Sequence, residues 1–322
     1  MKDTEYAFAV AKVRANENKL LSETAVENVI TASDYSAAVK ALADAGFADF
    51  SSGDTDKILS QKSKSAFELI CDCAPEKSCL DFLIVKNDFH NIKAFLKSMV
   101  TRTDCTKYLL FPSLTDYETL KKALEGKQYA LLPEFEADSA KHSYDVLMKT
   151  MDGQLVDVIL DRASLEAQIK LAKDSKDDFA IGLAEHIAAT TDIKILLRCI
   201  RTGKDKEFML DAVAECSSVN KDRLIESALE GIDEYSDYVR SSGFASLADS
   251  MKTGDVAFEK EIDDLLIDYV KNAKFQSFGI APLVAFYFAS ESEIKTVRII
   301  LSCKKNGLDI KNIRERVRKL YV

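Results

Sequence analysis

The chain has 322 residues, of which 47% are hydrophobic, so it is long enough to form several domains with sizeable cores. Its 44 basic and 53 acidic residues give a net charge of −9, which argues against generic nucleic-acid binding, because that binding relies on a basic face. The longest nearly apolar run, residues 280–289, is about half the length that spans a bilayer, so we expect a soluble chain.

The start of the chain lacks the apolar segment of a secretory signal, since charged residues follow Met1 directly. We therefore expect the chain to stay in a reducing compartment. Its seven cysteines are odd in number and scattered, so we predict reduced thiols rather than disulfides.

Low glycine and proline content favours helix along nearly the whole chain. Only 4 Pro and 11 Gly interrupt long stretches rich in Ala, Leu, Lys, Glu and Asp. Residues 5–21, 144–171 and 258–274 are each apolar on a helical period, which predicts helices there. The sequence therefore predicts an all-α protein.

One helical pattern occurs three times. Its copies begin at Ile92, Ile193 and Ile294, so that successive copies start 101 residues apart. The first two copies place apolar residues at i, i+3, i+4 and i+7, which form one stripe along a helix. In the third copy, Arg298 takes the i+4 position that leucines hold in the other two.

A further apolar segment precedes each copy, and polar residues lie between the two. These joint residues are Asn87, Asp88, Thr190, Thr191 and Ser290. Their side chains can accept hydrogen bonds from the free N–H groups at a helix start, and Ser290 with Glu293 matches a capping box. We therefore predict a repeated unit of a helix, a tight polar joint and a second helix.

The repeat period indicates the domain organisation. Units of about 100 residues are longer than the roughly 34 to 47 residues of helical-hairpin solenoids. We expect three similar helical lobes about a pseudo-threefold axis, with linkers at residues 51–54, 132–133 and 241–243. The predicted lobes are residues 1–131, 132–240 and 241–322, the last including a basic C-terminal helix.

Nucleotide and hydrolase motifs are missing from the sequence. Neither Gly126-Lys127 nor Gly203-Lys204 is followed by Ser or Thr, and no G-x-G-x-x-G or G-x-S-x-G occurs. His90, His142 and His186 have no nucleophile nearby in the sequence. We therefore predict no catalytic residue, no cofactor and no small-molecule substrate.

One cysteine cluster resembles a metal site only loosely. Cys71, Cys73, Cys79 and His90 follow the spacing C-x-C-x5-C-x10-H. The usual C-x2-4-C pair of a zinc site is absent, so we interpret these residues as thiols and a histidine near helix ends, and we predict no metal.

Four stretches, taken in order and spacing, resemble a known family. They are YAFAVAKVRANENKLLS from residue 6, LIVKNDFHNIKAFLKS from 83, TTDIKILLRCIRTGK from 190, and the segment from FGIAPLVAFYF to NIRERV, residues 278–317. Together they resemble the C subunits of the V/A-type rotary ATPases and ATP synthases, which are homologous to the d subunit of the vacuolar enzyme. Ser290 departs from the family pattern, in which lysine is common at that position.

The resemblance implies a fold and a role. The three lobes would form a funnel on the cytoplasmic face of a membrane rotor ring, with the central-stalk subunits of D and F type in its open side. One non-catalytic copy per complex would transmit torque for proton or sodium transport coupled to ATP hydrolysis or synthesis. Residues that choose the ion would belong to the ring. The alternative is a free-standing helical scaffold that binds a partner helix.

Equal positions in the three lobes should point the same way relative to the axis, which nominates the polar joints as partner-interface candidates. With two arginines added, the candidates are Arg14, Asn87, Asp88, Asn91, Thr191, Asp192, Glu291, Glu293 and Arg298. Several are equally explained as helix caps. Arg298 has two explanations, since it either extends beside the core into water or meets acidic residues of the stalk.

The C-terminal 20 residues, 303–322, carry seven basic and two acidic residues. Ile310, Ile313, Val317 and Leu320 or Tyr321 could form the apolar side of a final helix with a solvated charged face. Alternatively, the arginines approach lipid headgroups or polar loops of the ring, which would be a peripheral membrane contact.

Overall fold

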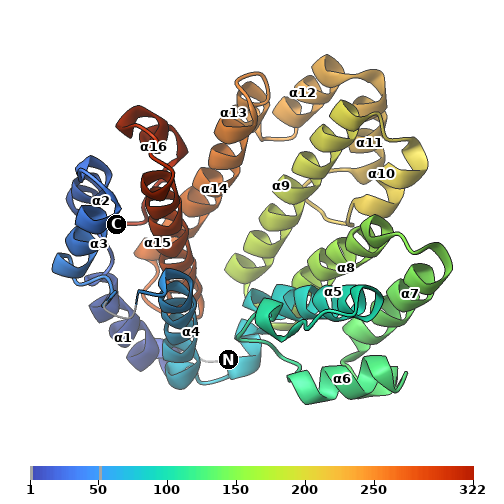
Figure 1. Ribbon diagram of the computed structural model, residues 1–322, viewed down its shortest axis with the longest axis horizontal. Coiled ribbons are helices and arrows are strands. Elements are labelled where there is room, and N and C mark those ends of the chain that lie inside the picture. Colours follow the sequence, from blue (N-terminus) through green and yellow to red (C-terminus); the bar gives the residue numbers. More distant parts are fainter. Residues whose placement is uncertain (1–2, 51–52) are drawn as a thin grey trace. The chain divides into compact units, whose positions relative to one another are not determined.

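The computed structural model describes residues 3–50 and 53–322, and in these ranges all regular secondary structure is helical (Figure 1). The expected all-α class is confirmed. Within the same ranges, none of the helices combines the length and the apolar character that crossing a membrane requires. The helices form two compact units, one from residues 1–77 with 245–322 and one from residues 78–244. The division into three lobes and the funnel stay predictions.

The first unit joins the two ends of the chain. Its helices are η1 (Asp3–Tyr6), α1 (Ala7–Glu17), α2 (Glu23–Thr31), α3 (Tyr35–Asp44), α4 (Thr55–Cys73), α13 (Ala245–Ser250), α14 (Asp255–Lys271), η5 (Asn272–Phe275), α15 (Ala281–Lys305) and α16 (Ile310–Arg316). Side-chain caps begin several of them: Ser22 accepts from the N–H of Ala25 at 3.2 Å, and Asp34 accepts from that of Ala37 at 2.9 Å.

The core of the first unit forms around α15. Ile294, Val297 and Leu301, the apolar stripe of the third repeat copy, are buried against residues of α2, α3 and α4 such as Val29 and Leu42. Arg298, which interrupts that stripe in the sequence, is exposed. Burial of the apolar positions therefore orients α15 and leaves the odd position of the repeat at the surface.

The second unit contains the other helices. They are η2 (Lys77–Leu83), α5 (Val85–Thr101), η3 (Thr106–Tyr108), α6 (Tyr117–Glu125), η4 (Tyr129–Leu131), α7 (Glu134–Thr150), α8 (Gly153–Asp174), α9 (Asp178–Thr202), α10 (Lys206–Ala212), α11 (Lys221–Glu230) and α12 (Ile232–Ser241). The first repeat copy, on α5, buries Ile92, Phe95 and Leu96 against α6, α7 and α8. On α9, Ile193, Leu196 and Leu197 are buried in the same register.

The predicted joints between paired helices are wrong in the second and third copies, because α9 and α15 each continue through the joint without a break. Thr190 Oγ1 donates to the carbonyl of His186 at 2.9 Å, and Ser290 Oγ donates to that of Phe286 at 2.9 Å. Each hydroxyl is thus satisfied one turn back inside its helix, so it caps no new helix. In the first copy, the short helix η2 ends just before α5 begins at Val85, so Asn87 and Asp88 lie inside α5 and the predicted helix start at these residues is wrong too.

Two other predicted boundaries differ in the structure or lie partly outside its described ranges. The helix expected over residues 144–171 is two helices, because Met151 adopts a left-handed conformation and Asp152 caps α8. Of the linker expected at residues 51–54, residues 51 and 52 lie outside the described part. Gly53 has a positive φ of 73°, and Asp54 caps α4.

Candidate functional site

The position just before the isoleucine of each repeat copy holds a buried polar side chain: Asn91, Asp192 and Glu293. Each binds the backbone of a segment outside its own helix, 19, 22 and 272 residues away in the chain respectively. Asn91 makes two bonds to Leu110, accepting from its N–H at 2.7 Å and donating to its carbonyl at 3.0 Å. Asp192 accepts from the N–H of Ala214 at 3.1 Å, and Glu293 accepts from that of Leu21.

These three side chains therefore act as internal anchors within their own units. A helix presents no free N–H in its middle, so an acceptor there can reach a neighbouring segment whose own N–H lacks a partner. The anchors tie three non-helical segments to the long repeat helices. Their part in a partner interface stays a prediction.

The first turn of α5 holds a further loop of the second unit. Asp88 accepts from the N–H groups of Leu114 at 3.0 Å and Thr115 at 2.7 Å, and Asn87 donates to the carbonyl of Pro112 at 2.8 Å. The predicted joint residues of the first copy thus bind residues 112–115, while half-buried Thr191 lies in the uninterrupted α9.

Sequence reasoning missed Glu136, a buried carboxyl in the first turn of α7. Thr115 Oγ1 donates to Glu136 Oε2 at 3.2 Å. Burial, with nearby Asp88 as a second cause, raises the pKa of Glu136 to about 8. Burial also raises the pKa of Asp88 to about 6, although its bonds from Leu114 and Thr115 oppose the rise. No local sequence signal brings these two carboxyls together, because α5 and α7 meet only in the folded unit.

Asp192 is a third buried carboxyl with a perturbed titration. Burial raises its pKa to about 7, although the bond from Ala214 and the charge of Lys221 lower it. Its second oxygen, Oδ2, has no hydrogen-bond partner within the described chain.

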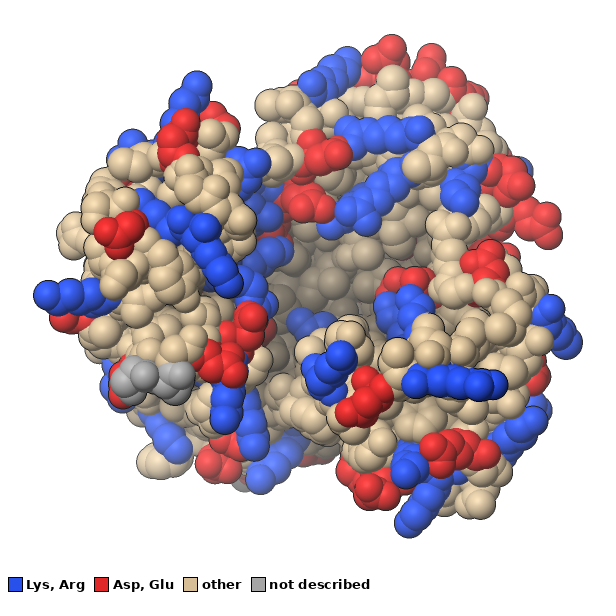
Figure 2. Space-filling model, in the orientation of Figure 1, with Lys and Arg blue, Asp and Glu red and all other residues tan. Residues whose placement is uncertain are grey.

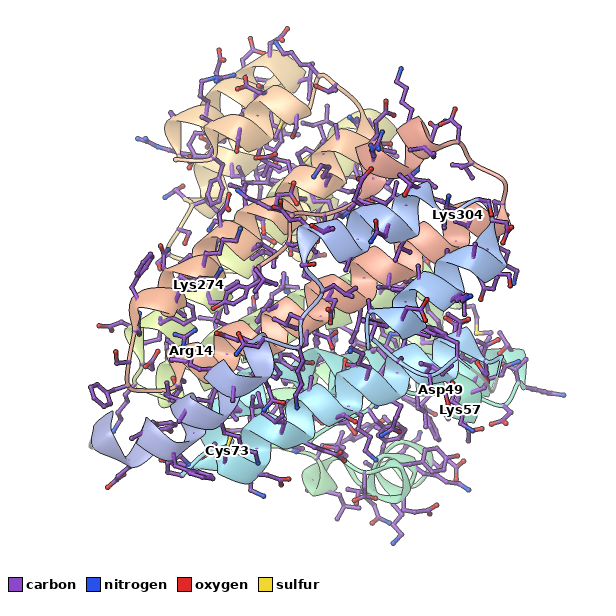
Figure 3. All side chains as sticks on the ribbon, turned by 90° about the vertical axis from the view of Figure 1, so that its left-hand side faces the viewer. Arg14, Asp49, Lys57, Cys73, Lys274 and Lys304 are labelled. Carbon is purple, nitrogen blue, oxygen red and sulfur yellow. The ribbon has the colours of Figure 1, made fainter. Side chains whose placement is uncertain are left out.

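Arg14 connects three segments of the first unit. Its Nη1 donates to Glu17 Oε1 at 2.7 Å, and its Nη2 donates to the carbonyls of Ala273 at 2.6 Å and Gln276 at 3.2 Å. Tyr321 lies on the same cluster and donates to Glu17 Oε1 at 3.2 Å. Figure 3 shows Arg14 on α1 near the η5 segment that carries Lys274. This candidate residue is therefore fully engaged inside its unit.

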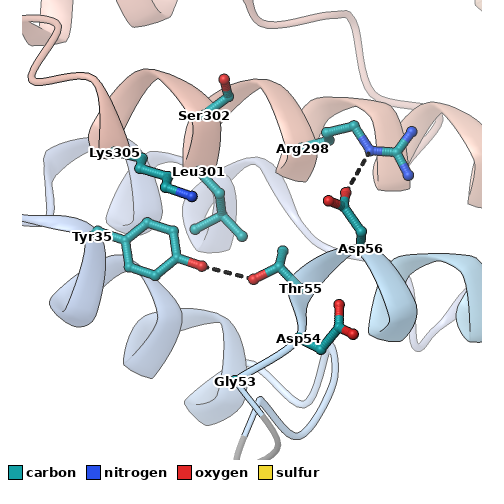
Figure 4. A pocket seen from close by; sticks show the side chains of 9 residues that line it. All are labelled: Tyr35, Gly53, Asp54, Thr55, Asp56, Arg298, Leu301, Ser302 and Lys305. Atoms are coloured by element: carbon teal, nitrogen blue, oxygen red, sulfur yellow. Dashed lines mark hydrogen bonds and ion pairs between the residues drawn. The ribbon is translucent and has the colours of Figure 1, made fainter.

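Arg298 lies at a pocket of about 830 Å³ on the first unit (Figure 4). Its side chain is 54% exposed, and Nε lies 3.9 Å from Asp56 Oδ1. The pocket is lined by Tyr35, Gly53, Asp54, Thr55, Asp56, Arg298, Leu301, Ser302 and Lys305. The lining thus includes two cations of α15 and two carboxylates at the start of α4, of which Arg298 and Asp56 form a pair. Exposed ion pairs contribute little to stability, which leaves Arg298 available to a partner.

Glu291 belongs to the same helix but not to this pocket. It is half-buried and accepts a hydrogen bond from Ser63 Oγ at 2.5 Å. Ser63 lies on α4, so the contact adds to the packing of α4 on α15.

Arg314, Arg318 and Lys319 of the basic tail pair with acidic residues of its own unit, and Lys304 donates to the carbonyl of Ala32. Arg318 is buried and lies 2.6 Å from Asp263 of α14, and Lys319 lies 2.5 Å from Asp268. Arg314 pairs with Glu27 of α2. The expected final helix is short, because α16 ends at Arg316 and the remaining residues lie extended along α14. The predicted apolar side of the helix is confirmed at Ile313, which is buried, but it is wrong at Ile310, which is exposed, and buried Tyr321 lies beyond the helix.

The visible surface of each unit mixes charges of both signs, and Figure 2 shows Lys and Arg interspersed with Asp and Glu. The seven cysteines are free thiols, as predicted. Cys73 Sγ donates to the carbonyl of Leu69 at 3.0 Å, and His90 Nε2 is 3.0 Å from the carbonyl of Tyr108. Across the described ranges, no group of three or more His, Cys, Asp and Glu side chains is arranged to hold a metal ion.

Comparison with known proteins adds the last observation. The family model described as ATP synthase (C/AC39) subunit matches residues 9–316. The C subunit of the V-type sodium ATPase of Enterococcus hirae is 24% identical, over 98% of this chain and 99% of the relative. The C subunit of the A-type ATP synthase of Methanobrevibacter smithii is 24% identical, over 94% and 85%. The C subunit of the V-type ATP synthase of Thermus thermophilus is 22% identical, over 97% and 98%.

Proposed function

Because the chain belongs to the ATP synthase (C/AC39) subunit family, whose members are structural rather than catalytic subunits, we propose that it is the adaptor between central stalk and membrane rotor ring. In this role it joins the stalk subunits of D and F type to the ring of a V/A-type rotary ATPase. It transmits torque at the cytoplasmic face of the membrane, as a single peripheral copy.

The observation that carries this proposal is the match to the C subunit of a rotary ATPase along nearly the full length of both chains. A similarity confined to one helical segment could reflect helical composition alone. Here the aligned region includes all three repeat copies and both compact units, so the same arrangement of elements supports the same role.

The internal anchors fit a part that carries torque. Such a protein must keep its helices in register under load, and closely packed interiors resist deformation. Asn91, Asp192 and Glu293 each fasten a loop to a long helix from inside the unit. These residues support the mechanical role from within rather than by touching a partner.

We assign the stalk contact to the Arg298 pocket. Arg298 and Lys305 lie seven residues apart, two turns along α15, with Leu301 and Ser302 between them. The exposed guanidinium of Arg298, whose ion pair with Asp56 is 3.9 Å long, can exchange Asp56 for a carboxylate of the stalk at little cost.

The test is co-elution. The purified chain is mixed with the central-stalk subunits and, separately, with the detergent-solubilised rotor ring. Binding to both is the expected result. A chain that elutes alone in both mixtures would contradict the adaptor role and favour a free-standing scaffold.

Arg298→Leu tests the stalk contact within the same experiment. We expect normal folding, unchanged ring binding and about tenfold weaker stalk binding, in the range of a lost interfacial charge pair. Arg198→Leu is the matched control, because Arg198 is an exposed arginine on the corresponding repeat helix, α9. Equal stalk binding by both variants would remove Arg298 from the interface.

A further inference from the structure

Residues 274–278, Lys-Phe-Gln-Ser-Phe, form an exposed loop that begins with the last two residues of η5 and leads toward α15. Phe275 is 89% exposed and Phe278 is 49% exposed, which is unusual for large aromatic side chains that the chain could bury. Two such residues in one five-residue loop form an apolar tip that has no function inside the unit.

Hydrogen bonds from Arg14 hold the backbone of this loop in place. Arg14 Nη2 donates to the carbonyls of Ala273 and Gln276, which flank Phe275, and the N–H of Gln276 donates to the carbonyl of Ala273 at 3.0 Å. Arg14 is held in turn by Glu17. Figure 3 shows Arg14 and Lys274 at the same edge of the first unit. The phenyl rings are therefore presented on an ordered backbone rather than on a loose tip.

A third exposed aromatic lies toward the same end of the unit. Arg14 of α1 contacts Ala273, which precedes α15, whereas Leu21, which follows α1, contacts Glu293 in the middle of α15. Later residues of the first segment thus meet later residues of the second, so α1 runs in the same direction as α15. Phe8, in the first turn of α1, is 72% exposed and precedes Arg14 by six residues, about 9 Å along the helix. It therefore lies toward the end where the 274–278 loop precedes α15.

The surroundings of the loop are basic. Lys271 and Lys274 precede Phe275 in the chain, and no carboxylate occurs between residues 269 and 290. Lys319 lies close enough that it and Lys274 contribute to lowering the pKa of Lys271, after burial as the main cause. The acidic neighbours include Glu17, which pairs with Arg14 at 2.7 Å, and Asp268, which lies 2.5 Å from Lys319. Glu23 also raises the pKa of Lys271.

We propose that the aromatic tip formed by Phe275 and Phe278, with Lys271 and Lys274 beside it, binds the surface of an anionic lipid bilayer. Exposed aromatic rings partition into the headgroup and acyl boundary, and nearby lysines are attracted to anionic lipids. A five-residue loop is small for a protein interface, since stable ones bury about 1,200 Å² or more. For shallow lipid contact, a few aromatic and basic side chains suffice.

The lipid contact is separable from the adaptor role, because vesicles contain no other protein. Sedimentation of the full chain is measured with vesicles of phosphatidylcholine alone and of equal parts phosphatidylcholine and phosphatidylglycerol. We expect binding to the anionic vesicles that weakens with added salt, and little binding to the neutral ones.

The variant Phe275→Ser/Phe278→Ser should reduce binding to the anionic vesicles about tenfold, and Lys274→Glu should reduce it severalfold. The control is Leu131→Ser/Leu229→Ser, which replaces two exposed leucines of the second unit and should bind as the unaltered chain does. Circular dichroism checks that all variants remain helical.

Three results would overturn the lipid proposal. The unaltered chain could bind neutral and anionic vesicles equally or not at all, or the Phe275→Ser/Phe278→Ser variant could bind as well as its control. The double variant could also keep its vesicle binding while losing the solubilised ring, which would assign the aromatic tip to a protein partner. In each case the stalk co-elution experiment is unaffected and still tests the adaptor role.

Discussion

Asp192 accepts the backbone N–H of Ala214 through Oδ1 at 3.1 Å and so fastens the segment after α10 to the middle of α9. The same register position holds Asn91 on α5, bonded to Leu110, and Glu293 on α15, bonded to Leu21. A repeat that looks in sequence like a helix-start signal is, in the folded units, a repeated internal anchor. The side chain at this position is an amide in Asn91 and a carboxylate in Asp192 and Glu293, but in each copy it accepts a hydrogen bond from a backbone N–H.

Replacing Asp192 by Ala should lower the free energy of unfolding by about 2 kcal/mol, because the N–H of Ala214 then loses its buried acceptor. The variant Asp192→Asn keeps an acceptor, so it should lower the free energy of unfolding by less than Asp192→Ala does. Urea denaturation followed by circular dichroism measures both. Asp211→Ala, at an exposed position of α10, is the control and should stay within about 0.5 kcal/mol of the unaltered chain. Equal losses for Asp192→Ala and Asp211→Ala would contradict the anchor.

The buried carboxyls should make stability fall as pH rises. Burial raises the pKa of Glu136 from 4.5 to about 8 and that of Asp192 from 3.8 to about 7. Between the ordinary and the raised pKa, the unfolded chain has released protons that the folded chain still holds. The free energy of unfolding contributed by these groups is therefore full below about pH 4 and decreases up to about pH 8.

Glu136→Gln isolates one share of this effect. The loss of unfolding free energy between about pH 5 and about pH 8 should shrink by roughly 2 kcal/mol, because glutamine has no charge to bury. Glu134→Gln is the control, since Glu134 lies exposed two residues earlier on the same helix. If both variants show the pH dependence of the unaltered chain, Glu136 ionises in the folded state as an exposed carboxyl does.

Arg14→Met should loosen the segment that precedes α15. Without the guanidinium, the carbonyls of Ala273 and Gln276 lose their donor, and local opening becomes easier. Amide hydrogens of residues 272–280 should exchange about tenfold faster by mass spectrometry, a factor that corresponds to one lost hydrogen bond. Lys12→Met, on the same helix, should leave their exchange unchanged. If the amide hydrogens exchange at the same rate in Arg14→Met, the loop is held by η5 without the hydrogen bonds of Arg14.

Ser290→Ala distinguishes a continuous helix from a capped joint. Because Ser290 Oγ only donates to Phe286 inside α15, its removal should change the free energy of unfolding by less than about 0.5 kcal/mol. Asp309→Ala provides the comparison, since Asp309 accepts from the N–H of Asn312 at 2.7 Å as a true cap and should cost about 1 kcal/mol. If Ser290→Ala lowers the free energy of unfolding as much as Asp309→Ala does, Ser290 acts as a helix cap after all.

Local pattern was enough for part of this protein. Apolar spacing predicted the helical class and the buried stripes of the repeat, including Ile92 and Ile193, because a helix of 3.6 residues per turn brings such residues onto one face whatever its neighbours are. The same spacing singled out Arg298 as the position that does not fit a core, and it is exposed. The order of four short stretches was also enough to indicate the family, which the match over residues 9–316 confirmed.

Contacts between distant segments decided the rest. Whether Ser290 starts a helix or lies inside one depends on the hydrogen-bond partner of its hydroxyl. In the folded unit that partner is the carbonyl of Phe286, one turn back in the same helix. Leu21 and Glu293 are 272 residues apart, so no local pattern could pair them, nor predict that Glu136 and Asp88 share one buried site. Local periodicity determines what each segment becomes, whereas burial and long-range hydrogen bonds decide what each polar side chain does, because those energies exist only once the segments have met.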